Sequence, residues 1–187
     1  MSAKRVWVVL SLLLIALPLK AESVRMEATA IEAYISSLPD VEALGARLEA
    51  SGRVSGWFEE MTPLPGLPFN PHQQAVARLV EQEPAFHYEL NKTVISHGFT
   101  SAQRWAEIGD RVILAYGALK AERENPALWQ LATRYQQLPP EMLSRWSAEA
   151  REQVIQALAI VRAFATSPAQ DKLSVAPYVS RLDSALR

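Results

Sequence analysis

The chain has 187 residues, of which 49% are hydrophobic and 21% are charged, so it can bury the core of one ordinary domain. The formal net charge is −1, which argues against a nucleic-acid-binding surface because such surfaces are strongly basic. The chain has no cysteine, which excludes disulfides, thiolate-bound metals and catalysis by a thiol.

The first residues have the order of a secretory signal peptide. Lys4 and Arg5 precede the uncharged apolar run Val6–Leu17, and the small residue Ala21 follows. The run is shorter than the roughly 20 apolar residues that a membrane-spanning helix needs. We therefore predict a signal peptide over residues 1–21, cleaved after Ala21. The residues just before Ala21 depart from the ideal cleavage pattern, so an uncleaved N-terminal membrane anchor is the alternative.

Cleavage would leave one helical domain over residues 22–187. It would remove three basic residues and no acidic one, which changes the net charge from −1 to −4. Such a mildly acidic chain argues against binding to nucleic acid or anionic lipid, and we expect no membrane insertion after cleavage. At this size a core can hold the fold without disulfides.

Hydrophobic spacing predicts helices in the first part of this domain. One helical face recurs over Ser23–Leu38, and Pro39 is expected to stop that helix. A second helix follows over Val41–Leu48, and Gly52 can close it in a left-handed conformation. A short third helix is expected over Val54–Met61.

A proline-rich loop, residues 62–71, then interrupts the helical pattern. Four prolines within it exclude both a helix and a central strand. Asn70 followed by Pro71 predicts a helix start, with the Asn70 side chain as the cap. Pro84 restarts the pattern, which ends at Gly98.

The strongest predicted helix spans about residues 101–123. Thr100 and Gln103 fit a capping box at its start. Gly109 and Gly117 lie inside it, where each costs about 1 kcal/mol relative to alanine. We therefore expect both glycines to admit a closely packed neighbour.

Prolines and capping residues also divide the last third of the chain. Helices are expected from Asn125-Pro126, from Ser147 to about Thr166, and after Ser167-Pro168 with a break at Pro177, while a short turn follows Pro139-Pro140. The segment Val154–Ala165 is apolar nearly all round, so we expect that helix near the centre of the fold.

The predicted fold is therefore all-α, an irregular orthogonal bundle of about seven to nine short, proline-punctuated helices. The predicted core consists of Ile31, Ile35, Leu44, Leu48, Leu79, Phe86, Leu90, Trp105, Ile108, Val112, Tyr116, Leu131, Val154, Leu158, Val161 and Phe164.

The sequence contains no recognisable catalytic or metal motif, and we predict no catalytic residue, no metal and no cofactor. His87 and His97 would lie roughly 15 Å apart along one helix, too far to share a metal. His72 is expected to be neutral and exposed. The adjacent acids Glu59 and Glu60 are expected to be solvated, although carboxylates from distant helices could still assemble a pair.

Two groups of residues are candidate binding sites. The first flanks and includes the proline-rich loop, and its apolar side chains could contact a partner or rest on the core of a stiff connector: Trp57, Phe58, Leu64, Leu67 and Phe69. The second is a candidate anion patch at Arg104 and Arg111, which share one side of a helix with Glu107. The other interpretation of this side is an exposed, ion-paired face.

The segment from Gly98-Phe-Thr-Ser through Trp105-Ala-Glu-Ile-Gly-Asp-Arg-Val to Ala115-Tyr116 resembles a stretch of small, uncharacterised all-helical periplasmic proteins of Gram-negative bacteria. The resemblance implies a periplasmic location and an all-helical fold. It implies no known activity, and no functional residue is transferred through it.

The leading functional hypothesis is an exported, non-enzymatic binding or interaction protein of the bacterial envelope. The alternative is a periplasmic carrier of a small apolar ligand, held in a cavity between helices. A carboxylate-based envelope hydrolase is the third hypothesis. An exposed apolar patch would favour the first, and an apolar cavity the second.

Overall fold

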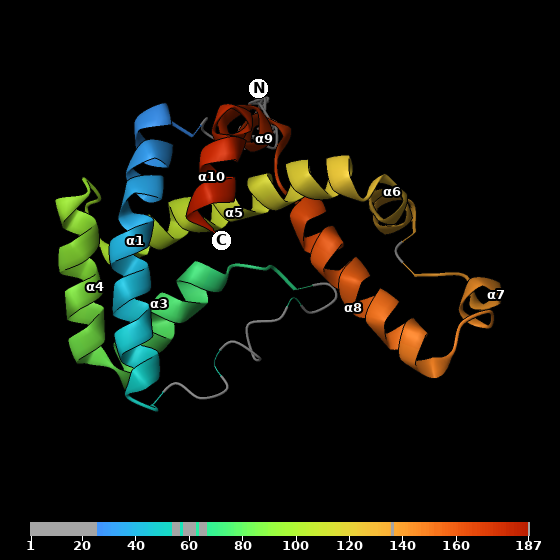
Figure 1. The fold of residues 1–187 in the computed structure, drawn as a ribbon, viewed down its shortest axis with the longest axis horizontal. Helices are drawn as coiled ribbons and strands as arrows, with labels where there is room; N and C mark the ends of the chain where they lie inside the picture. The colour runs from blue at the N-terminus through green and yellow to red at the C-terminus, as the bar shows by residue number, and fades with distance from the viewer. Residues whose placement is uncertain (1–25, 54–56, 58–62, 64–66, 136, 187) are drawn as a thin grey trace, which may run out of the picture.

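In the computed structural model, the described residues form helices joined by short connections, with no strand among them (Figure 1). The structure describes residues 26–53, 57, 63, 67–135 and 137–186. The predicted signal peptide and all of the predicted helix over 54–61 except Trp57 lie outside these residues. The helices are α1 (Ala28–Ala50), α3 (Pro71–Gln82), α4 (Pro84–Ser96), α5 (Ala102–Glu124), α6 (Pro126–Arg134), α7 (Pro140–Leu143), α8 (Ala148–Ala165), α9 (Ala169–Val175), the 3₁₀ turn η1 (Ala176–Tyr178) and α10 (Val179–Ala185). The predicted all-α class is therefore confirmed.

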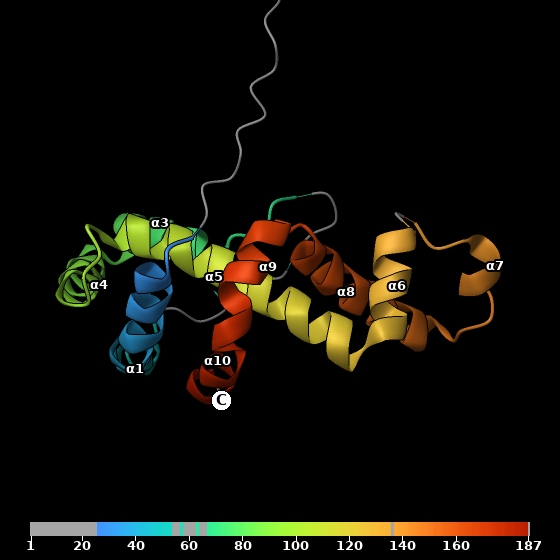
Figure 2. The same ribbon diagram turned by 90° about the horizontal axis from the view of Figure 1, so that it is seen from above.

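The other helices are arranged around α5, which runs through the middle of the molecule (Figures 1 and 2). It packs against α1, α3, α4, α6, α8 and α9. Many of its buried positions are small, which lets neighbours approach from several sides: Ala102, Ala106, Gly109, Ala115, Gly117 and Ala118. The predicted cap at Thr100 is wrong by one residue, because the hydroxyl oxygen of Ser101 accepts the amide hydrogen of Arg104 at 3.1 Å.

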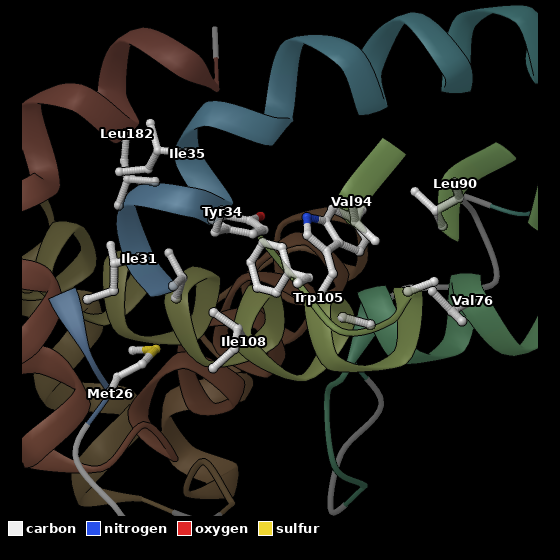
Figure 3. Close-up of a cluster of buried hydrophobic side chains, with 14 of the residues drawn as sticks. Met26, Ile31, Tyr34, Ile35, Val76, Leu90, Val94, Trp105, Ile108 and Leu182 are labelled. Carbon is white, nitrogen blue, oxygen red and sulfur yellow. The ribbon is translucent and has the colours of Figure 1, made fainter. Parts of the chain in front are cut away.

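The buried side chains form two hydrophobic clusters. The larger cluster joins α1, α3, α4, α5, α9 and α10, and it includes Tyr34 and Trp105 (Figure 3). The smaller cluster joins α6, α7 and α8 around Leu158 and Val161. These three helices form an arm at one end of the elongated molecule (Figure 2). Eleven of the predicted core residues are buried, and five are only half-buried: Phe86, Tyr116, Leu131, Val154 and Phe164.

The prediction that the helix around Val154–Ala165 lies near the centre is wrong. This helix, α8, belongs to the arm, and only Leu158 and Val161 are buried on it. Ile155 and Ile160 keep 44% and 38% of their surface exposed. Small and polar residues separate the large apolar residues of α8. A single side of the helix therefore makes its contacts with α5 and α6.

Pro39 does not end the first helix as predicted. It lies inside α1, where it is exposed and removes one hydrogen bond, to the carbonyl group of Ile35. Buried residues on both sides of it, including Ile31 and Leu44, pack into the same cluster. This packing outweighs the local preference of proline to break a helix.

The two glycines of α5 admit close neighbours, as predicted. A Cβ atom at Gly109 would lie 2.8 Å from the Tyr34 ring and 3.0 Å from the His72 ring. A Cβ atom at Gly117 would lie 2.6 Å from the ring of Phe164, on α8. Gly117 is therefore a position of close contact between α5 and the arm.

We expect Gly117→Ala to destabilise the fold by about 1–3 kcal/mol, because the new methyl group must displace the Phe164 ring. Gly45→Ala on α1 is the matched control, since Gly45 is exposed and a Cβ there would meet nothing within 4 Å. The control should stabilise the fold by about 0.5–1 kcal/mol through helix propensity. Urea unfolding of both variants measures this, and equal stabilisation by both would contradict the packing at Gly117.

Candidate functional site

The candidate partner residues near the proline-rich loop have different environments. Trp57 is half-buried against the larger cluster, with the Arg78 guanidinium 5.8 Å from its ring centroid. Leu67 is 62% exposed, and Phe69 is half-buried. Phe58 and Leu64 lie outside the described residues. Leu67 is therefore the member of this group that the structure leaves most open to solvent among those it describes.

The candidate anion patch at Arg104 and Arg111 consists of arginines that already bind carboxylates. Arg104 donates to Glu107 one helical turn away, at 3.0 Å. Arg111 donates two hydrogen bonds, of 2.6 and 2.9 Å, to the fully buried carboxylate of Asp171 on α9. This bond holds the pKa of Arg111 above its ordinary value. The geometry favours the interpretation of an ion-paired face.

The sequence reasoning missed a buried polar network centred on Asp110. Its carboxylate, in the middle of α5, accepts the backbone amide hydrogens of His72 at 2.8 Å and Gln73 at 3.2 Å. It also accepts from the Gln73 side chain at 3.0 Å and from the Nδ1 atom of His72 at 2.9 Å. Asp110 thereby caps the first turn of α3 from another helix, where the helix dipole favours a negative charge.

This arrangement corrects two expectations. Asn70 does not cap α3 with its side chain; its Oδ1 atom accepts from the side chain of Gln74 instead. His72 is not a solvent-exposed histidine, because only 18% of its side chain is exposed and both ring nitrogens have partners. The cap came from a residue 38 positions away, which no local pattern could show.

Tyr34 completes the network from α1. Its hydroxyl group lies 2.9 Å from Nε2 of His72, and the residue is fully buried. Burial and the nearby charge of Asp110 raise the pKa of Tyr34 far above its ordinary value. The Tyr34 hydroxyl is therefore neutral and shares a hydrogen bond with Nε2 of His72, whose Nδ1 atom donates to the Asp110 carboxylate.

Trp105 is a core residue, as predicted. Its ring centroid lies 5.9 Å from that of Tyr34 and 5.1 Å from that of His72. Its indole N–H donates to the hydroxyl oxygen of Ser37 at 2.9 Å, and Ser37 donates to the carbonyl oxygen of Tyr34. Figure 3 shows Tyr34 and Trp105 side by side between α1 and α5.

The order carboxylate, imidazole and hydroxyl in this network is that of a catalytic triad. A nucleophile must reach a substrate, however, and the Tyr34 hydroxyl has no exposure to solvent. A phenol with a raised pKa is also a poor source of the reactive anion. The arrangement therefore joins α1, α3 and α5 rather than presenting a reactive group.

A second group of a carboxylate, an imidazole and a hydroxyl lies at the surface between α1 and α4. Nε2 of His97 is 2.8 Å from Asp40, and Nδ1 is 3.2 Å from the hydroxyl oxygen of Ser36. The Ser36 hydroxyl donates to the Ala33 carbonyl oxygen at 2.9 Å, so its hydrogen is directed at the helix and not at the imidazole. An activated serine would give that hydrogen to the base, so this contact is an interhelical clasp.

The C-terminal helix α10 is held to α5 by a third polar group. Asp183 accepts from the Tyr116 hydroxyl at 2.6 Å and from Lys120 at 2.8 Å. These two bonds, chiefly that from Lys120, hold the pKa of Asp183 below its ordinary value. The contacts of Asp110, His97, Arg111 and Asp183 therefore each connect helices to one another.

Two open hollows are lined by described residues. One, of about 310 Å³, lies between the start of α1 and the α9–η1 segment, and its lining includes Met26, Leu173, Pro177 and Tyr178. The other, of about 440 Å³, is lined by polar residues of α6, including Arg134. Within the described ranges, no cluster of three metal-ligating acids or histidines and no helix long and apolar enough to cross a membrane is found.

Comparison with known proteins found no matching family model, no similar curated protein and no similar solved structure. The function is therefore argued from the residues of this chain.

We expect Asp110→Ala to destabilise the fold by about 2–4 kcal/mol, because it leaves two backbone amides of α3 and the His72 ring without their acceptor. Glu107→Ala, one turn earlier and exposed in its ion pair, should change stability by less than about 0.5 kcal/mol. Chemical denaturation of both variants measures the difference. Equal effects would contradict the structural role of Asp110.

The hydrogen bonds of Asp183 clasp α10 to α5, and their contribution to stability should depend on pH in the acidic range. The pKa of Asp183 is lower in the folded state, so its contribution is complete above its ordinary pKa of 3.8 and is lost as the pH falls through the lowered folded value. The melting temperature of Asp183→Asn should therefore lie below that of the parent at neutral pH, and the two should converge below about pH 3. Glu122→Gln, at an exposed acid two residues after Lys120 on α5, should show no such convergence. A difference between Asp183→Asn and the parent that stays constant with pH would contradict the clasp.

Proposed function

We propose that this chain is an exported, non-enzymatic interaction protein of the bacterial envelope and that it binds through the outer face of α8. We define this outer α8 face by Ile155, Gln156, Ala159, Ile160 and Ala163. The proposal rests on one observation above the others. A helix that is apolar nearly all round is normally buried, yet this one lies on the outside of the arm with two isoleucines exposed.

The outer α8 face has the character of a contact surface. Ile155, Ala159 and Ala163 recur at every fourth residue and so form one row along the helix. Gln156 and Ile160 form the neighbouring row. The five residues of the outer α8 face carry no charge, and Arg151 and Glu152 stand at the N-terminal ends of its two rows. An uncharged centre with charged residues at its edge is typical of a protein interface.

The polar groups of the larger cluster support binding over catalysis. The Asp110 network is buried between packed helices, and the contacts of His97, Arg111 and Asp183 each join two helices. These polar groups are thus already engaged in contacts that hold the helices together.

Export is the second part of the proposal, and it rests on the charged start, the apolar run and Ala21 at the N-terminus. We expect the protein recovered from its own cells to begin at Glu22. Intact-mass measurement on a periplasmic fraction tests this. A mass that includes residues 1–21, recovered with the membrane, would favour the anchored alternative.

The carrier hypothesis remains the second candidate because of the hollow beside α9. Leu173 lines it with 66% of its surface exposed, and Met26 contributes an apolar wall. A carrier should bind an apolar fluorescent probe there, and Leu173→Glu should abolish that binding while Ile155→Glu should not. An unchanged signal in Leu173→Glu would remove this candidate.

Photo-crosslinking in cells tests the proposed surface. A benzoylphenylalanine placed at Ile160 should give a discrete protein adduct, because this side chain lies on the outer α8 face. The same group at Tyr88, which is 71% exposed on α4, is the control and should give none. The adduct is identified by mass spectrometry, and its binding is rebuilt from purified components, where Ile155→Glu should weaken it at least about tenfold. No adduct at Ile160, or the same adduct from both positions, would contradict the proposal.

A further inference from the structure

The imidazole of His97 lies between two groups on α1 that both accept hydrogen bonds. Its Nε2 atom is 2.8 Å from the carboxylate of Asp40, which has no hydrogen to donate when it is ionised. Its Nδ1 atom is 3.2 Å from the hydroxyl oxygen of Ser36, whose hydrogen is already donated to the carbonyl oxygen of Ala33. Both ring nitrogens therefore face acceptors, and only the protonated imidazole carries a hydrogen on each nitrogen.

The position of His97 in the fold also favours a positive charge. It is the C-cap of α4, where the helix dipole presents its negative end, and the last turn of α4 contains no basic residue. Only 19% of the His97 side chain is exposed, so water competes for its hydrogens less than it does at an exposed histidine. The dipole and the two acceptors thus act in the same direction.

Other charges on the helices packed here are bound elsewhere or lie on another side. Three of these charged groups are paired: Glu32 with Arg181, Arg47 with Glu89, and Arg104 with Glu107. Lys92 lies five residues before His97 on α4, about 140° around that helix, and Glu42 lies two residues after Asp40, about 160° around α1. Asp40 is therefore the charged group that the structure places in contact with the ring.

We propose that His97 is a proton-dependent clasp, which holds the C-terminal end of α4 against α1 when its imidazole is protonated and releases it when the imidazole is neutral. The neutral ring has one hydrogen for two acceptors, and it has no charge to pair with Asp40. Ser36 can donate to the bare nitrogen only by giving up its bond to Ala33. The protonated form is thus the one in which every member of the contact has a partner.

The part of α4 that the clasp holds is suited to local opening. The helix ends at Ser96, and Gly98 directly after it turns the chain towards α5 with a φ of +94°. The ion pair between Arg47 and Glu89, about two turns earlier, holds the middle of α4 against α1. Release of His97 therefore loosens the last turn of α4 and leaves the rest of the helix in place.

Hydrogen exchange read by mass spectrometry tests the clasp on the peptide that spans residues 93–101. Histidine changes its charge between about pH 5 and pH 8, so the purified protein is compared at about pH 5.5 and about pH 8. After correction for the intrinsic pH dependence of exchange, this peptide should be protected at least about threefold more at the lower pH. His97→Gln should remove that difference, because an amide side chain does not change its charge over this range.

Two further variants make the comparison specific. His87→Gln is the matched control on the same helix, since the His87 side chain has no hydrogen bond or ion pair among the described residues, and it should keep the pH dependence of the parent. Asp40→Asn should lose the pH dependence while it stays better protected than His97→Gln, because an amide can either accept from the ring or donate to it. Asp40 is exposed, so this variant keeps the test decisive if His97→Gln does not fold.

Magnetic resonance of the histidine rings gives a second readout, which a merely structural role would not move. Both ring N–H signals of His97 should be observable at the lower pH, because hydrogen bonds to Ser36 and Asp40 slow their exchange with water. The ring signals of His87 should be lost under the same conditions, since the structure gives that ring no acceptor among the described residues.

The outcomes decide the clasp independently of the proposed outer α8 face, which lies on the arm. Greater protection at the lower pH that is lost in both His97→Gln and Asp40→Asn, together with two ring N–H signals from His97, supports the proposal. Equal protection of the parent at the two pH values overturns it. A pH dependence that persists in Asp40→Asn, or a single ring N–H signal from His97 at the lower pH, also overturns it.

Discussion

The carboxylate of Asp110 is the contact on which the larger half of the molecule depends. It sits in the middle of α5 and caps the first turn of α3, so two helices are fixed relative to each other by one side chain. Through His72 and Tyr34 the same carboxylate reaches α1. A buried charge is tolerated only where donors surround it, and here two backbone amides, an imidazole and an amide side chain do so.

Small residues in α5 are the second condition for this fold. Gly109 leaves room for the rings of Tyr34 and His72, without which the Asp110 network could not form at its observed distances. Gly117 does the same for Phe164 and so brings the arm onto the central helix. Both glycines reduce the intrinsic stability of the helix, and the packing that they permit on both sides of α5 compensates for that cost.

The arm carries the surface that we propose for binding. Its three helices share a small cluster of their own, which leaves one side of α8 outside any packing among the described residues. The apolar content of α8 exceeds what contacts with α5 and α6 use. Burial of this excess by a partner releases water from apolar surface, which is the general driving force for association. The surface thus follows from a mismatch between the composition of a helix and its place in the fold.

Local sequence determined the all-helical class, most helix starts and stops, and the close packing at Gly109 and Gly117, because propensity, capping and proline effects act over a few residues. It also indicated Trp105 as core, since hydrophobic spacing shows which face of a helix is buried. Tertiary structure alone decided that α1 continues through Pro39, that Asp110 caps α3, and that α8 lies on the outside. These features depend on contacts between residues far apart in the chain. A local sequence pattern does not show the energy of such contacts.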